Sequence, residues 1–344
     1  MTARFFCIGP VRAHRVRARG LSLAFALGFS LSACAQIALP QLPGNPTPQP
    51  PITPAPPTTP PVTPTPPVTP PATLEPRPVG SPDVVVLAFS GRCSAPCSAP
   101  TDNWNYLGAK LVGGQPYWGT VARIQSAFES LGKSVQSYGY SSFLSTHTSN
   151  ALENYLKPSS EEGFLQLEAK LKQVYTNWIW GRSNPTQVVL VGHSHGVNWT
   201  HQFARAHPEI PIAYLIDFDG ISSAWESDNK SFIENYYAQQ GKNPWPIALE
   251  RAAQTIAVQG TSDLFDSKDV VPDNVKYNLE LRSLNNFLYA GCFLSDTITN
   301  RRLNNTQSGI YRLDSSSECH SQIAFGTGQG VAWVVARIAE LGLP

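Results

Sequence analysis

Residues 187–197 read QVVLVGHSHGV and predict a strand, a sharp turn and a helix in succession. The first five residues are mostly apolar and β-branched, which is typical of a strand covered on both faces of a parallel sheet. Gly192 and Gly196 stand two residues to either side of Ser194, so the chain can turn sharply there and raise the serine hydroxyl above the sheet. We expect a helix to begin near Val197, which would place its positive N-terminus beneath the serine.

The five residues from Gly192 to Gly196 fit the pattern Gly-x-Ser-x-Gly between a strand and a helix. This arrangement resembles the nucleophile elbow of the α/β-hydrolase superfamily, which contains lipases and esterases. The resemblance implies a serine hydrolase that cleaves ester bonds with Ser194 as nucleophile and with no metal or organic cofactor. The alternative is a structural strand–turn–helix in which the serine is incidental.

A serine nucleophile needs a base within reach, and His320 is the candidate. The other six histidines precede the serine, flank it or follow it closely: His14, His147, His193, His195, His201 and His207. Only His320 lies far downstream, and the resembling family orders its triad as Ser, acid, His. We interpret the two histidines inside the elbow as packing or pocket residues. A surface histidine in a polar loop is the other interpretation of His320.

Asp219 is the expected acid of the triad, because it ends the strand that follows the elbow helix. Lipases of the pancreatic type, within the family that the elbow resembles, place the acid at this strand end. Three rivals remain open: Asp217 two residues earlier, Asp263 near the end of the next predicted strand, and Asp296 further on.

The developing negative charge on a reacting carbonyl oxygen needs backbone amides as donors. The resemblance implies that the amide of His195 is one of them, and that the loop after the first strand supplies the second from Ser90 or Gly91. A calcium site at Asp263, Asp266 and Asp269 is not expected, since the glycine and glutamate of an EF-hand loop are absent.

The block 83–344 alternates predicted strands and helices, which is typical of an α/β domain with a mostly parallel central sheet and helices on both faces. The predicted strands are Asp83–Phe89, Ser134–Tyr138, Gln187–Val191, Ile212–Phe218, Thr255–Val258, Val275–Leu281 and Ile310–Leu313. The predicted helices are Thr120–Leu131, Glu161–Trp180, the elbow helix and Val331–Leu341.

The N-terminal segment carries a basic cluster and then a short apolar run, the parts of a secretory signal. Leu31-Ser32-Ala33-Cys34 resembles the bacterial lipoprotein signal, which implies that Cys34 becomes lipidated. A plain signal peptide is the alternative. We expect residues 1–33 to be the signal and the protein to be exported to the bacterial cell envelope, where the lipid alone holds it on a membrane.

Residues 40–82 contain 19 of the 31 prolines and cannot bury a core. We therefore expect 34–82 to be the lipidated cysteine and an extended Pro/Thr-rich linker before the catalytic domain at 83–344. In an exported chain the four cysteines of that domain favour two disulfides, Cys93–Cys97 and Cys292–Cys319. A four-thiolate zinc site is the less favoured interpretation, because the second pair lacks a close spacing.

The formal net charge is +1 and only 14% of residues are charged, which argues against nucleic acid as a partner. We expect a monomer that acts on a small-molecule or lipid ester. Two other functions stay open: a non-catalytic binding lipoprotein with a hydrolase fold, and an acyltransferase that uses the same residues.

Overall fold

The protein is described from a computed structural model that covers residues 73–91, 106–107, 119–142, 147–148, 160–161, 163–227, 229, 252–284 and 298–344. The expected signal segment, Cys34, Cys93, Cys97, Cys292 and Asp296 lie outside these ranges, and what the sequence predicts for them stays a prediction. Within the described residues, no helix has both the length and the apolar character needed to cross a bilayer.

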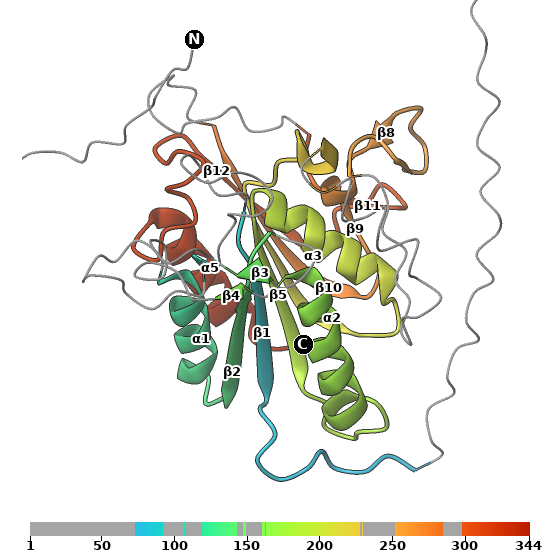
Figure 1. Ribbon diagram of the computed structural model, residues 1–344, viewed down its shortest axis with the longest axis vertical. Helices are drawn as coiled ribbons and strands as arrows, with labels where there is room; N and C mark the ends of the chain where they lie inside the picture. The colour runs from blue at the N-terminus through green and yellow to red at the C-terminus, as the bar shows by residue number, and fades with distance from the viewer. Residues whose placement is uncertain are drawn as a thin grey trace, which may run out of the picture. The chain divides into compact units, whose positions relative to one another are not determined.

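A six-stranded sheet forms the centre of the domain, in the order β12-β10-β6-β5-β1-β2 (Figure 1). Its strands are β1 (Val84–Phe89), β2 (Val135–Tyr140), β5 (Gln187–His193), β6 (Ile212–Phe218), β10 (Val275–Ser283) and β12 (Ile310–Ser315). Every neighbouring pair in this sheet is parallel, so all six carboxyl ends meet at one edge. The predicted parallel α/β sheet is therefore confirmed.

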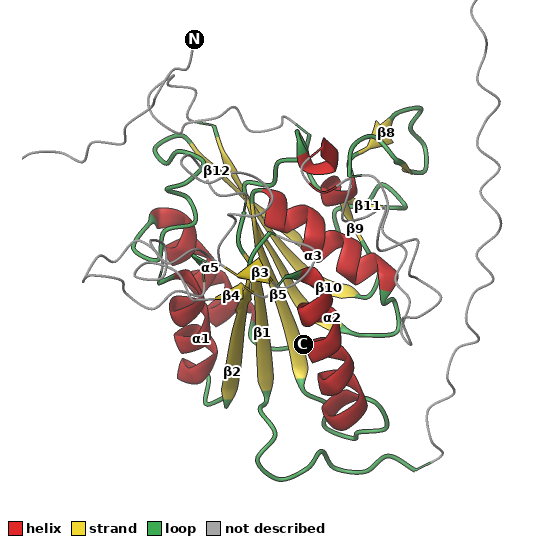
Figure 2. Ribbon diagram, viewed as in Figure 1, coloured by secondary structure: helices red, strands yellow, loops and turns green. Residues whose placement is uncertain are grey.

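Helices cover both faces of this sheet (Figure 2). They are α1 (Thr120–Ser130), α2 (Phe164–Val174), α3 (His195–Ala206) and α5 (Gln329–Leu341). Buried side chains of α2 and α3 belong to one apolar cluster, and those of α1 and α5 belong to another. Alternate residues of β1 enter the two clusters, and all six of its side chains are fully buried. The strand is thus apolar at every position because both of its faces are covered.

The helix predicted over Glu161–Trp180 is wrong at its start. Ser160–Glu161 forms the short strand β4, which pairs antiparallel with β3 (His147–Thr148). The helix begins only after Gly163, whose N–H donates to the Gln166 side chain at 3.1 Å. It ends in a π-helical turn, Tyr175–Ile179. Glu161, the first residue of the predicted helix, therefore belongs to a strand pair.

The region predicted as the strand Thr255–Val258 lies outside the central sheet. Its Ile256–Ala257 forms β7, which pairs antiparallel with β8 (Leu264–Phe265). A further small ladder joins β9 (Val270–Val271) to β11 (Arg301–Arg302), after a short 3-10 turn at Ser267–Asp269. These two-residue pairs are separate from the main sheet, and the 3-10 turn between them packs against α3.

Residues that the sequence assigns to the end of the linker contact the domain at the amino edge of the sheet. The Glu75 N–H donates to the Gly181 carbonyl at 3.0 Å, and the Glu75 carbonyl accepts from Ser183 at 2.8 Å. Arg77 forms an ion pair with Asp83. The pKa of Asp83 falls to about 2 because the Ser134 amide and then the Arg77 side chain stabilise its carboxylate.

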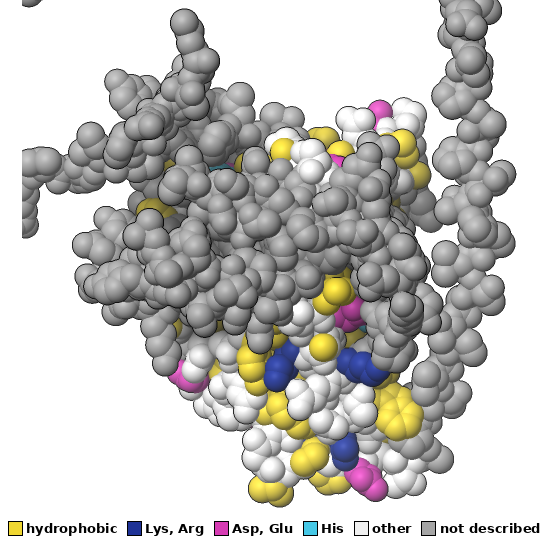
Figure 3. Space-filling view, viewed as in Figure 1, with side chains coloured by type: hydrophobic (Ala, Val, Ile, Leu, Met, Phe, Trp, Pro, Cys, Tyr) yellow, Lys and Arg dark blue, Asp and Glu magenta, His cyan; other side chains and the backbone are white. Residues whose placement is uncertain are grey.

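The described part of the surface carries charged, apolar and uncharged polar side chains side by side. In the face seen in Figure 3, single Lys and Arg side chains lie apart from one another among apolar and uncharged groups. The exposed large apolar side chains are equally scattered: Leu74, Val79, Leu264, Leu284 and Leu303. Isolated apolar residues of this kind are ordinary on a protein surface.

Candidate active site

Ser194 occupies the sharp turn between β5 and α3 in a strained conformation, with φ 56° and ψ −124°. Its N–H donates to the Phe218 carbonyl at 3.0 Å, and its carbonyl accepts from Val197 at 3.1 Å and from Ile221 at 3.3 Å. A non-glycine residue at positive φ persists only where its surroundings hold it there. These three backbone bonds hold the serine in the turn. Its side chain is 6% exposed.

Gly192 and Gly196 occupy positions where the backbone packing leaves no room for a side chain. A Cβ on Gly196 would lie 2.3 Å from the Phe89 carbonyl oxygen, and one on Gly192 would lie 2.7 Å from the Val197 Cα. Both neighbours are backbone atoms, which cannot move aside as a side chain can. The elbow therefore packs directly on the carboxyl end of β1 at Gly196. This close packing is the reason why only small residues fit at these positions.

Asp219 and His320, 101 residues apart, are joined by a hydrogen bond of 2.6 Å between Oδ2 and Nδ1. The other carboxylate oxygen of Asp219 accepts from the Ser283 amide at 2.7 Å. Both residues are buried, at 1% and 7% exposure. Because Nδ1–H donates to the acid, Nε2 of His320 is left with the lone pair that can accept a proton.

His320 lies beside the elbow through its contacts with His193, the residue before Ser194. The two imidazole rings are 4.7 Å apart between centroids. The His193 Nε2–H donates to the His320 carbonyl oxygen at 2.9 Å. The structure therefore brings the predicted serine, base and acid to one place at the carboxyl edge of the sheet.

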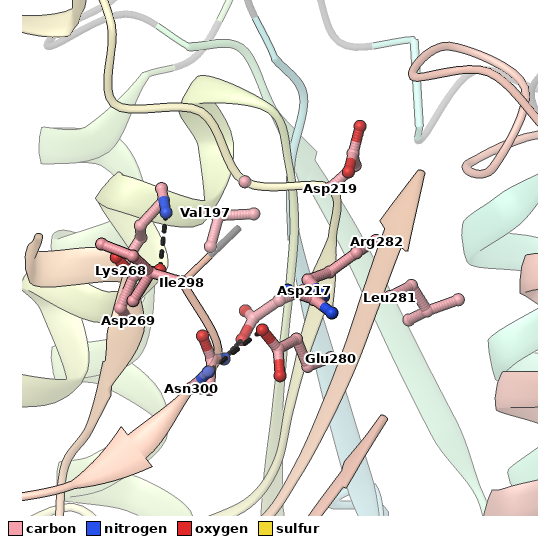
Figure 4. Close-up of a pocket in the computed structure, with 11 residues that line it drawn as sticks. Val197, Asp217, Asp219, Lys268, Asp269, Glu280, Leu281, Arg282, Ile298 and Asn300 are labelled. Atoms are coloured by element: carbon pink, nitrogen blue, oxygen red, sulfur yellow. Dashed lines mark hydrogen bonds and ion pairs between the residues drawn. The ribbon is translucent and has the colours of Figure 1, made fainter. Parts of the chain in front are cut away.

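Asp217 belongs to a different group of side chains. Its Oδ2 accepts from His201 Nε2 at 3.0 Å, from Asn278 Nδ2 at 2.6 Å and from Asn300 Nδ2 at 2.9 Å. In Figure 4 the carboxylate of Asp219 stands at the strand end and points away from this group. Asp263, the third described aspartate considered for the triad, is exposed in the turn between β7 and β8.

A small cavity of about 20 Å³ is lined by both Asp217 and Asp219. Its polar lining comes from β6, β10 and the segments after them: Asp217, Asp219, Lys268, Asp269, Glu280, Arg282 and Asn300. This volume is about that of one water molecule. Lys268 is bonded to Asp269 at 2.5 Å, and burial raises the pKa of Glu280 although Arg312 donates to it at 2.6 Å. Among the described residues, no three His, Cys, Asp or Glu side chains gather as metal ligands would.

The three backbone amides that are expected to hold an oxyanion differ in their surroundings. His195 is the first residue of α3, so its N–H belongs to the positive helix end. The Ser90 N–H donates to the Tyr140 carbonyl at 2.9 Å and so extends the pairing of β1 with β2; its role as an oxyanion donor stays a prediction. The Gly91 N–H donates to the Tyr106 hydroxyl at 2.7 Å. A Cβ on Gly91 would lie 2.5 Å from the Ser194 Cβ, so Gly91 borders the nucleophile directly.

Tyr106 is a site residue that was not predicted from the sequence, and its hydroxyl bonds to the Nδ1 of His193. Burial and, to a lesser degree, the neighbouring His320 lower the pKa of His193 to about 3. Burial also raises the pKa of Tyr106. At neutral pH the imidazole of His193 is thus uncharged and the phenol keeps its proton. Tyr106 lies in a loop without periodicity, which gives no sign in the sequence of where its hydroxyl will be.

The neutral state of His193 predicts a pH dependence of stability. Its folded pKa of about 3 lies below the ordinary value of 6.5, so the unfolded chain binds more protons in between. The stabilisation is complete above about pH 6.5 and is lost as the pH falls toward 3. Between pH 7 and pH 4, wild type should lose on the order of 3 kcal/mol more of its free energy of unfolding than His193→Asn. Urea titrations at both pH values measure this, and equal losses would contradict it.

No family model matches the chain, and no curated protein sequence matches it. Solved structures with a similar fold include Est1E from Butyrivibrio proteoclasticus with ferulic acid bound, at 10% identity over 77% of this chain and 91% of that one, TM-score 0.34. An esterase domain from a Rhodothermus marinus protein is 13% identical over 78% and 90%, TM-score 0.34. Mouse alpha/beta hydrolase domain-containing protein 10 is 12% identical over 75% and 88%, TM-score 0.33. At such identities and TM-scores, the likeness says nothing about the activity of this chain.

Proposed function

We propose that the protein is a serine hydrolase that cleaves an ester through Ser194, His320 and Asp219. The observation that carries the proposal is the 2.6 Å bond between Asp219 and His320 beside a serine held at φ 56°. Strained backbone at a buried polar site is typical of a nucleophile. The substrate class in this proposal is a small-molecule or lipid ester.

In the first half of the reaction, Asp219 fixes the imidazole with Nδ1–H toward itself. His320 Nε2 takes the proton of the Ser194 hydroxyl as Oγ bonds to the ester carbonyl carbon. The carbonyl oxygen becomes an oxyanion, which the His195 amide at the start of α3 stabilises. Asp219 stabilises the imidazolium that forms and does not itself take a proton.

In the second half, the imidazolium gives its proton to the leaving alcohol, and the bond between carbon and alcohol oxygen breaks. An acyl group then remains on Ser194 Oγ. Water attacks this acyl carbon while His320 Nε2 accepts the proton of water, and the acid is released with the serine restored. An acyltransferase would use the same groups and differ only in admitting an alcohol in place of water.

The N-terminal predictions complete the proposal. Lipidation at Cys34 would anchor the domain to a membrane of the bacterial envelope, and the Pro/Thr-rich segment would hold it at a distance. A disulfide between Cys292 and Cys319 would restrain the residue directly before the base. Such support of a catalytic side chain reduces its freedom to leave the productive position.

Covalent capture by a fluorophosphonate tests the proposal. Incubation of the purified domain should add one phosphonyl group to the peptide that contains Ser194, as read by mass spectrometry. Ser194→Ala should take up none. Ser223→Ala, which changes a nearby exposed serine, should react like wild type. A folded wild-type protein that takes up no probe would reject the proposed function and favour a binding protein with an idle fold.

A further inference from the structure

A continuous chain of hydrogen bonds runs behind the nucleophile and joins three separate segments. The Gly91 N–H donates to the Tyr106 hydroxyl at 2.7 Å, and that hydroxyl bonds to Nδ1 of His193. Nε2 of His193 bonds to the His320 carbonyl at 2.9 Å. Tyr106, His193 and His320 are all buried, at 5%, 3% and 7% exposure. The chain connects the loop after β1, the elbow and the loop that carries the base.

One direction of donation satisfies these three bonds together. The Tyr106 oxygen accepts the Gly91 N–H, so its single proton is available for Nδ1 of His193. That bond leaves the ring proton of His193 on Nε2, where it donates to the His320 carbonyl. A charged His193 would have no lone pair for the tyrosine. The uncharged imidazole is therefore an acceptor at one nitrogen and a donor at the other.

We propose that His193 and Tyr106 are positioning residues, which set the distance between the base and the nucleophile by holding the backbone of residue 320. This inference rests on the proposed function. Ser194 and Asp219 are held by backbone bonds to β6 and β10. His320 stands on a loop after β12, where its ring bonds to Asp219 and its backbone carbonyl bonds to His193. His193 is adjacent to Ser194, so its bond to the His320 carbonyl relates the base directly to the nucleophile.

The geometry gives this bond a kinetic role, because small displacements of a catalytic group reduce the rate strongly. A misplacement of about 1 Å can reduce a rate by about 100-fold. The loss falls on the chemical step, since neither Tyr106 nor His193 is assigned to substrate binding. The expected signature is therefore a lower kcat at a nearly unchanged KM.

Two substitutions at position 193 test separately the hydrogen bonds made by the two nitrogens of the imidazole. In His193→Gln the longer side chain can place an amide N–H near the former position of Nε2 and keep the bond to the His320 carbonyl. In His193→Asn the shorter amide can accept from Tyr106 but does not reach that carbonyl. Tyr106→Phe removes the hydroxyl and keeps the ring that packs edge-on against His193, with centroids 5.6 Å apart.

The assay is hydrolysis of p-nitrophenyl butyrate by the folded protein, with kcat and KM measured across pH. We expect kcat to fall about 30- to 100-fold in His193→Asn and less than about fivefold in His193→Gln, with KM within about threefold in both. Tyr106→Phe should lower kcat about tenfold. The double variant Tyr106→Phe/His193→Asn should lose no more than His193→Asn, because both act through one chain. His207→Gln is the control, since that buried histidine bonds Glu209 at 3.2 Å, remote from the elbow.

The outcomes separate the possibilities. A folded His193→Asn with kcat within about threefold of wild type overturns the positioning role. Equal losses in His193→Gln and His193→Asn overturn it as well, because packing would then matter and the bond to the His320 carbonyl would not. If position 193 tolerates no substitution, a Tyr106→Phe protein with unchanged kcat and pH profile overturns the positioning role instead. Failure of the proposed function looks different: wild type itself would not hydrolyse the ester or take up the fluorophosphonate.

Discussion

Replacing Ser194 by alanine is expected to lower kcat for p-nitrophenyl butyrate by about 10⁴- to 10⁶-fold, because the attacking oxygen is removed and only background stabilisation by the site remains. The domain should still fold, since the three backbone bonds that hold residue 194 do not use its side chain. Steady-state hydrolysis of the purified variant measures the loss, and circular dichroism checks the fold.

Ser194→Gly is the informative companion. It should lose activity to the same extent as Ser194→Ala. Its free energy of unfolding should be about 1–2 kcal/mol higher than that of wild type or Ser194→Ala, because glycine adopts φ 56° without the steric cost that a Cβ brings. Urea unfolding of both variants measures the difference. Retention of more than about a hundredth of the wild-type kcat in either variant would remove Ser194 from the mechanism. A glycine variant less stable than alanine would show that the turn is not strained.

Asp219→Asn is expected to lower kcat by about 10³- to 10⁴-fold. The amide can donate to Nδ1 of His320, which then holds its proton on Nε2 and cannot accept one from Ser194. The bond lost is the 2.6 Å contact between Oδ2 and Nδ1. The fall should be in kcat, with KM changed little, because the carboxylate acts on the base and not on the substrate.

Asp217→Asn is the matched control, because Asp217 lies two residues earlier, at the end of β6, and is also buried. It should lower stability, because Asp217 accepts three side-chain donors, and it should leave kcat within about threefold of wild type. The reverse result, with Asp217→Asn nearly inactive and Asp219→Asn active, would assign the acid to the other carboxylate. Parallel assays of the two variants decide between them.

The sequence predicts the central strands best where both faces are covered. β1, β5 and β6 are found because each is a continuous, mostly apolar run of six or seven residues. The two-residue ladders such as β3 with β4 have no such signal, because chain segments apart in sequence determine them. The start of α2 is misjudged for the same reason, since strand pairing uses the residues that look like its first turn.

The candidate site divides in a similar way. Chain order and the elbow pattern lead to Ser194, Asp219 and His320. The structure joins Asp219 to His320 and places His320 against His193, the residue before Ser194, while their catalytic roles stay predictions. The choice between Asp217 and Asp219 depends on where each side chain points, and the positive φ of Asp219, 48°, is not readable from sequence. The hydroxyl of Tyr106 and the engaged amide of Ser90 are likewise properties of the folded chain.

One peptide unit links the nucleophile to the acid. The Phe218 carbonyl accepts the Ser194 N–H at 3.0 Å, and the next residue along the chain is Asp219. Serine and aspartate are thus mounted on a common rigid frame, whereas the histidine arrives on a separate arm, 101 positions after the aspartate. A change in the length of the segment around His320 would therefore move the histidine relative to the other two residues, while the bond between Ser194 and Phe218 could stay as it is.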